Sequence, residues 1–215
     1  MKRFTNILFI AGGANWHNTA LKRAVFLAKE NQADLTVADA IEFSPDLQVI
    51  GREKRDRLTA DFASSRLARL DELVQPVRDE LTVQTRVIEG APFLEIIREV
   101  LRHGHDLVMV TAQGRSNLKE RFFGSTTMHL MRKCPCPVWV VKATQPEWHT
   151  RILAAVDPNP NDEERQALNV KIMDLATSLA RLEQRELVVV HAWTFPVERS
   201  LRGGHVRLSS DVDRW

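Results

Sequence analysis

The stretch that decides the fold runs from Asp106 to Val141 and reads DLVMVTAQGRSNLKERFFGSTTMHLMRKCPCPVWVV. An apolar run opens it and leads into a polar loop with two glycines, Gly114 and Gly124. Ser125 follows the second glycine directly, and a helical pattern begins there. Glycines let a backbone approach a ligand closely, and the first N–H groups of a helix have no partner within it. The stretch therefore predicts a cradle for an anion such as a phosphate, although a connection without a ligand can show the same pattern.

The composition is that of an ordinary soluble globular protein. The 215 residues are 44% hydrophobic and 27% charged, and a formal net charge of +2 does not suggest a nucleic-acid binder. No apolar run approaches the roughly 20 residues of a membrane span, and the N-terminus has no signal-peptide core. The two cysteines, Cys134 and Cys136, stand too close together for an ordinary structural disulfide. We therefore expect a cytoplasmic protein with reduced thiols, no nucleic-acid partner and no membrane span.

Strand-like and helix-like segments alternate before and through the opening stretch. Strands are predicted at residues 7–11, 35–40, 81–88, 107–110 and 138–141, and helices at 16–30 and 56–78, from 92 and from 125. The helix at 56–78 is amphipathic, with one face formed by Leu58, Phe62, Leu70, Leu73 and Val77. Such alternation is typical of a parallel sheet with helices on both faces and right-handed crossovers. The predicted fold class is α/β, with a doubly wound, Rossmann-like, five-stranded parallel sheet.

A partial second unit follows the first. Residues 143–150 read as a polar linker, after which Ile152-Leu153 repeats Ile7-Leu8, and Asn161 or Asp162 offers a helix cap. The helix carries an apolar stripe and precedes a strand at 187–192; the stripe consists of Leu168, Ile172, Leu175, Leu179 and Leu182. We therefore predict a complete unit at 1–142, a partial βαβ unit at 151–194 that docks on the first, and an irregular tail at 195–215.

Ligands of open α/β sheets bind beyond the carboxyl ends of the strands. The glycine loop lies at such an end, and so do Gly12 and Gly13 after the first strand and Ala40 at the end of the second. The predicted ligand site therefore combines these three residues with a phosphate cradle formed by Gly114, Arg115, Gly124, Ser125 and Thr126.

The loop, the alternation and the internal repeat together resemble a tandem universal stress protein, over residues 3 to about 194. The family's nucleotide-binding members carry a glycine, two residues, a second glycine, nine residues and then Gly-Ser or Gly-Thr. Gly114 and Gly124-Ser125 match the later parts, but Thr111 stands at the first glycine. The family's ATP binders also have an aspartate where this chain has Gly12.

Two further segments resemble the E-type branch of that family: His105 to Val108, and His129 to Lys142, which includes the Cys-Pro-Cys-Pro motif. Proteins of that branch have two complete units. This chain resembles one that ends after the second strand of its second unit. The resemblance implies a stress-response binding or signalling protein that acts without catalysis and binds ATP, or another phosphate-bearing ligand, only weakly. The alternatives are an interaction module that has lost ATP binding, and a carrier of an anionic metabolite or lipid.

Metal binding and catalysis have little support in the sequence. Cys134 and Cys136, with His129 nearby, could bind a metal if His103 and His105 supplied further ligands, but Cys-Pro-x-Pro-Val is also the ordinary start of the family's last strand. No carboxylate pair and no nucleophile with a plausible base is recognisable. We therefore expect no metal and no enzymatic activity.

The last strand of the first unit carries a partner prediction. In the resembled family this strand commonly pairs with its counterpart in another unit. Here the second unit ends before that strand, so the edge formed by Val138, Trp139, Val140 and Val141 is predicted to mediate a homodimer. The alternative is an edge covered by the second unit or the tail.

Overall fold

The computed structural model describes residues 3–12, 18–44, 46, 49–112, 124–142, 151–159 and 161–192. The chain divides into two compact units, residues 1–146 and 147–215, which are described separately. The predicted linker at 143–150 and the predicted tail at 195–215 lie outside the described residues.

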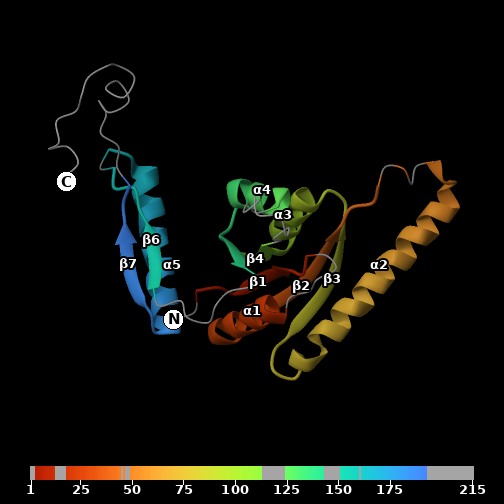
Figure 1. The fold of residues 1–215 in the computed structure, drawn as a ribbon, viewed down its shortest axis with the longest axis horizontal. Helices are drawn as coiled ribbons and strands as arrows, with labels where there is room; N and C mark the ends of the chain where they lie inside the picture. The colour runs from red at the N-terminus through yellow and green to blue at the C-terminus, as the bar shows by residue number, and fades with distance from the viewer. Residues whose placement is uncertain are drawn as a thin grey trace, which may run out of the picture. The chain divides into compact units, whose positions relative to one another are not determined.

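The first unit is built on a five-stranded parallel sheet (Figure 1). Its strands follow the order β3-β2-β1-β4-β5, so the direction of strand addition reverses between β1 and β4. This arrangement confirms the predicted doubly wound α/β class, because the chain adds strands first to one side of β1 and then to the other. The strand bounds are β1 Asn6–Ile10, β2 Asp34–Ile41, β3 Val83–Glu89, β4 Leu107–Ala112 and β5 Val138–Lys142.

Two helices pack on each face of this sheet. On one face, α1 (Asn18–Asn31) packs on β1 and β2, and α2 (Arg52–Val74) packs on β2 and β3. On the other, α3 (Pro92–His103) and α4 (Ser125–Lys133) share a hydrophobic core with the sheet. That core contains Leu8, Ile10, Ala38, Ile88, Ile96, Val100, Val108, Val110 and Leu130. Alternate residues of each strand thus supply one face, as the period of an extended strand requires.

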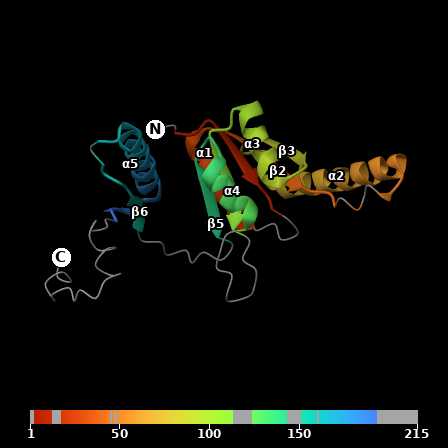
Figure 2. The ribbon, with the colours of Figure 1, turned by 90° about the horizontal axis from the view of Figure 1, so that it is seen from above.

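The long helix α2 differs from the prediction in its bounds and in what its apolar face contacts. It ends at Val74 and is followed by a short 3-10 helix, η2 (Gln75–Val77), which contains Pro76. Leu70 is fully buried, but Leu58 and Phe62 remain 44% and 46% exposed. Figures 1 and 2 show why: the first half of the helix runs beyond the sheet. Only the second half of the predicted stripe therefore serves the core of this unit.

The second unit forms the predicted parallel βαβ arrangement. It consists of β6 (Arg151–Ala155), α5 (Glu163–Glu183) and β7 (Glu186–Val190). The predicted cap is confirmed, because the carboxylate of Asp162 accepts a hydrogen bond from the backbone N–H of Arg165. None of the helices in the described part of the chain combines the length and apolar character that a membrane span requires.

The unequal burial along α2 gives a stability prediction. Leu70→Ala should lower the free energy of unfolding by about 2–5 kcal/mol, since it removes a fully buried side chain and leaves a cavity. Leu58→Ala should cost clearly less, about 1 kcal/mol or below, because nearly half of the residue is already exposed to water. Urea unfolding of the two variants measures both effects, and equal losses would contradict the observed division of the helix.

Candidate functional site

Those predicted ligand residues that the structure describes lie at the carboxyl ends of the strands of the first sheet. Gly12 follows β1, Ala40 lies near the end of β2, and Gly124 and Ser125 stand at the start of α4. Parallel strands bring their carboxyl ends together, and β1 is the neighbour of both β2 and β4. The ends of β1 and β4 thus flank the point where the strand order reverses, the usual ligand position in such sheets. Gly13, Gly114 and Arg115 lie outside the described residues.

The start of α4 has the properties of an anion site. Gly124 is the N-cap residue, at φ −55° and ψ 158°, and its carbonyl accepts the first helical hydrogen bond, from Met128. Among the described residues no side chain caps this end, and the first turn, which includes Ser125 and Thr126, has no acidic residue. The first N–H groups of the helix therefore lack helical partners, and the positive end of the helix dipole is not offset there.

The backbone conformation explains the residue type at two positions near the carboxyl ends of β1 and β4. Gly12 has φ +26°, within the left-handed region that glycine adopts most easily. Thr111 is a strand residue, because β4 continues past the predicted end at Val110 and pairs Thr111 with Val141. A β-branched residue suits that strand position, but its Cβ occupies space that a glycine would leave open.

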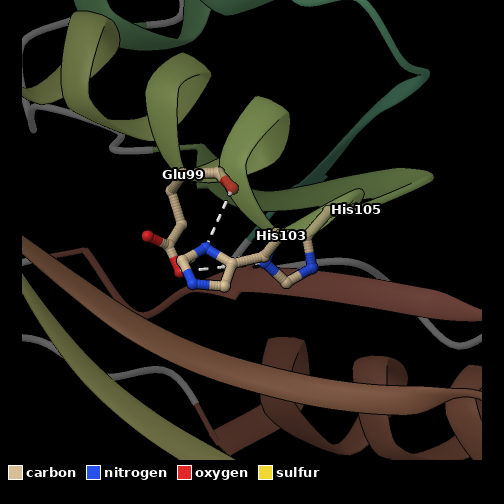
Figure 3. A group of neighbouring side chains, drawn as sticks. All are labelled: Glu99, His103 and His105. Carbon is tan, nitrogen blue, oxygen red and sulfur yellow. Dashed lines mark hydrogen bonds and ion pairs between the residues drawn. The ribbon is translucent and has the colours of Figure 1, made fainter.

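A polar cluster that was not predicted from the sequence lies at the amino end of β4 (Figure 3). Glu99 and His103 are one turn apart near the end of α3, and His105 follows the left-handed cap residue Gly104. Nδ1 of His103 lies 3.2 Å from Oε1 of Glu99, and Nε2 of His105 lies 3.9 Å from the same oxygen. The guanidinium of Arg86 lies 3.2 Å from that oxygen.

The structure therefore brings His103 and His105 to Glu99 and not to the cysteines. Among the described residues, these three form the one group that could hold a metal ion. His129 stacks on Phe93, with ring centroids 4.6 Å apart. The signal available in the sequence was the four-residue spacing of Glu99 and His103, which places two side chains on one helix face.

Burial lowers the pKa of His105, against the opposing effect of the Glu99 carboxylate. An imidazole loses solvation when it is buried, so its neutral form is favoured.

The two cysteines form a pair of their own. Their sulfur atoms lie 3.6 Å apart, and both residues are half-buried. A hydrogen bond from Cys136 lowers the pKa of the Cys134 thiol to about 7, although burial acts in the opposite direction. The same pairing raises the pKa of Cys136. Cys134 is therefore the stronger nucleophile near neutral pH.

The comparison with known proteins assigns the family. The model of the universal stress protein family matches residues 3–142, nearly all of the first unit. The chain belongs to the universal stress protein family.

Its relatives agree with the E-type resemblance seen in the sequence. The chain is 29% identical to universal stress protein E of Escherichia coli K12, over 89% of this chain and 61% of that protein. It is 26% identical to universal stress protein YxiE of Bacillus subtilis, over 65% of this chain and 99% of that protein. This universal stress protein thus spans about three fifths of the length of its E-type relatives.

Solved structures support the fold over both units. A functionally unknown protein from Pseudomonas aeruginosa PAO1 matches with a TM-score of 0.70 at 25% identity, covering 94% of this chain and 66% of that one. A universal stress protein from P. aeruginosa UCBPP-PA14 matches with a TM-score of 0.71 at 24% identity and the same coverage. The second likeness shows the fold alone.

The cysteine pair gives a prediction for this universal stress protein. Cys134 should react with iodoacetamide with a midpoint near pH 7, because the Cys136 hydrogen bond stabilises its thiolate. Cys136→Ala removes that bond and should move the midpoint upward toward about 8.5, the ordinary cysteine value. The alkylation rate at each pH, followed by peptide mass spectrometry, measures both midpoints. A wild-type midpoint near 8.5 would contradict the pairing.

Proposed function

We propose that this protein is a stress-response binding protein that acts without catalysis and binds a phosphate-bearing ligand weakly, with a nucleotide as the first candidate. The proposal rests on one observation. Helix α4 comes after β4, a strand at the reversal point of the sheet, and begins at a glycine N-cap that no described side chain caps. Phosphates are favoured at such helix starts by both the free N–H groups and the helix dipole.

The expected weakness follows from two residues. Thr111 places a Cβ where the family's nucleotide binders have a glycine, and Gly12 offers no side-chain acceptor for a ribose. Each lost contact is worth on the order of 1–3 kcal/mol, or roughly ten- to a hundredfold in affinity. We therefore expect ATP with magnesium to bind more weakly than micromolar.

A second candidate function is self-association through β5. This strand lies at the edge of the sheet, with Val138, Trp139 and Val140 half-buried and Val141 buried. Among the described residues, β5 pairs with β4 alone, and β6 and β7 form a separate sheet. An apolar edge strand with free backbone groups on one side favours pairing with a second copy of itself. We propose a homodimer on this ground.

The nucleotide proposal is tested at the N-cap of α4. Gly124→Val should weaken ATP binding at least tenfold, because the added side chain crowds the first N–H groups. A Cβ at Gly124 meets nothing within 4 Å, and its φ of −55° suits any residue, so the fold should persist. Isothermal titration with ATP and magnesium measures the loss.

Gly51→Val is the matched control, since Gly51 caps α2 at φ −51° and also has open space around its Cβ position. Like Gly124→Val, it replaces an N-cap glycine and should lower helix stability by a similar amount, but it should leave ATP binding unchanged. Wild-type affinity in Gly124→Val would contradict the site, and micromolar affinity in the wild type would contradict the two predicted losses. ADP release above background would contradict a non-catalytic role.

The dimer proposal is tested at the two edges of the sheet. The wild type should scatter light as a dimer at tens of micromolar. Val138→Lys should shift it toward the monomer, because an edge strand that carries a charged side chain pairs poorly with another strand. Val138 also packs against the core below α3 and α4, so circular dichroism should first show that the variant is folded. Val87→Lys places the same charge on the opposite edge strand, β3, and should leave the dimer intact. A monomeric wild type, or equal effects of both variants, would contradict pairing through β5.

A further inference from the structure

Glu99, His103 and His105 converge on one point because of how α3 ends. Glu99 and His103 share a face of the helix at a spacing of four residues. Gly104, at φ +67°, then turns the chain so that His105 enters the start of β4 beside them. Figure 3 shows the carboxylate of Glu99 directed toward both imidazole rings. The C-terminal end of a helix also carries a partial negative charge, which favours a cation at this place.

The distances between the three side chains are compatible with a shared ion. The three ligand atoms all lie within 4.8 Å of one another. Two ligands of a tetrahedral zinc ion lie roughly 3.4 Å apart, given zinc–ligand distances of about 2.0–2.2 Å. The separations from Oε1 of Glu99 are 3.2 Å to His103 and 3.9 Å to His105. The second is too long for a hydrogen bond, and small side-chain movements would bring both into coordination range.

Two of the three ligand atoms are buried without a hydrogen bond. Glu99 is 6% and His105 is 5% exposed. Among the described residues, Oε1 of Glu99 and Nε2 of His105 have no hydrogen-bond partner, although Glu99 makes ion-pair contacts. Buried polar atoms are nearly always satisfied, and a cation between these two atoms would give both a partner.

The neighbouring amide of Asn6 fixes the orientation of His105. Its Nδ2 donates to the backbone carbonyl of His103 at 2.8 Å, so its Oδ1 must accept from Nδ1 of His105 at 2.7 Å. A neutral His105 therefore presents the bare lone pair of Nε2 toward the Glu99 carboxylate. Two acceptors then face each other in a buried site, and a cation between them removes the conflict. Histidine ligands of metals are commonly held by such a partner on the other ring nitrogen.

Arg86 occupies the remaining side of the cluster. Its Nη1 lies 2.7 Å from Nε2 of His103 and 3.2 Å from Oε1 of Glu99. A metal on Nδ1 of His103 requires a proton on Nε2, so Arg86 must turn away when the metal binds. The metal would also replace the 3.3 Å contact between Nδ1 of His103 and the backbone carbonyl of Glu99. The side chain is 36% exposed and lines an open cleft of about 520 Å³ that also reaches Glu99. This cleft provides room for that movement.

We propose that Glu99, His103 and His105 bind a divalent transition-metal ion, Zn²⁺ first, with the remaining coordination position filled by water. Imidazole and carboxylate suit zinc, and three protein ligands leave one position open. The site lies at the amino end of β4, whereas the proposed phosphate site lies beyond its carboxyl end. The two proposals therefore stand or fail separately.

The test uses the full chain with Cys134→Ser and Cys136→Ser, so that no thiol competes for the metal. Titration with Co²⁺ should give a saturable visible spectrum at one equivalent, and Zn²⁺ should displace it. Glu99→Gln and His103→Gln should each weaken Co²⁺ binding at least tenfold, because each removes a ligand. The His103 side chain is partly exposed, so that variant should fold even if the buried Glu99 variant does not. His129→Gln, outside the cluster, is the control and should bind as the parent does.

Arg86→Gln separates a metal site from a purely structural network. Removal of the competing guanidinium should tighten Co²⁺ binding several-fold, since the carboxylate is then free of its ion pair. A structural network alone predicts no metal binding in either form. The proposal is overturned if neither the parent nor Arg86→Gln shows saturable binding at millimolar Co²⁺. Binding that survives His103→Gln unchanged would also overturn it.

Discussion

The carboxylate of Asp106 holds the two central strands of the sheet in register, and both candidate sites depend on that register. Its Oδ2 accepts hydrogen bonds from the backbone N–H and the hydroxyl of Thr5, at 2.6 and 2.8 Å, and its Oδ1 accepts from the N–H of Asn6 at 3.1 Å. The N–H of Asp106 in turn donates to the carbonyl of Asn6. Residues a hundred positions apart are thus joined at the amino ends of β1 and β4. Hydrogen bonds to a charged acceptor are stronger than neutral ones, so the start of this strand pair is well defined.

From that fixed start, the parallel ladder carries the register along the strands. Ile7 lies opposite Leu107 and Ile10 opposite Val110, so β1 and β4 reach their carboxyl ends at the same level of the sheet. Gly12 and the end of β4 at Ala112 then lie beside the point where the strand order reverses, as the phosphate proposal requires. At the other end, the same anchoring places Asn6 against His103 and His105. The hydrogen bonds of Asp106 therefore help to position both the ligand residues beyond the carboxyl end of β4 and the Glu99, His103 and His105 cluster at its amino end.

The elements of this fold could be predicted from the sequence because each has a local signal. The periodicity indicated the strands and helices, and Pro92 marked the start of α3. Asn161 and Asp162 marked the start of α5, where Asp162 is the cap. The apolar stripe of α2 was a weaker guide. Periodicity shows which residues share a helix face, but it does not show how far the sheet extends beneath them, so Leu58 and Phe62 read like Leu70.

The histidine cluster could not be predicted in the same way, because three separate conditions create it. The left-handed turn at Gly104 has to redirect His105, and Asn6 has to arrive from a distant strand. Burial of Glu99 is the third condition, and it follows from packing and not from its sequence neighbours. From the sequence, His103 and His105 could be considered only as further ligands for a site at the cysteines, because nothing in the sequence shows that Glu99 is buried beside them.

The two departures from the family's nucleotide motif differ in kind, and the structure shows why. Thr111 remains paired with Val141, so the backbone follows the sheet there and the change is steric: a side chain has been added at an ordered strand position. Gly12 sits at a positive φ that other residues adopt with strain, so restoring an acceptor at that position alone would work against the local backbone. A steric loss on a strand can be reversed by one substitution. At Gly12 a hydrogen-bond acceptor is missing, and to restore it the backbone has to leave its positive φ when the side chain is added. Gly12 is therefore harder to reverse by a single substitution than Thr111.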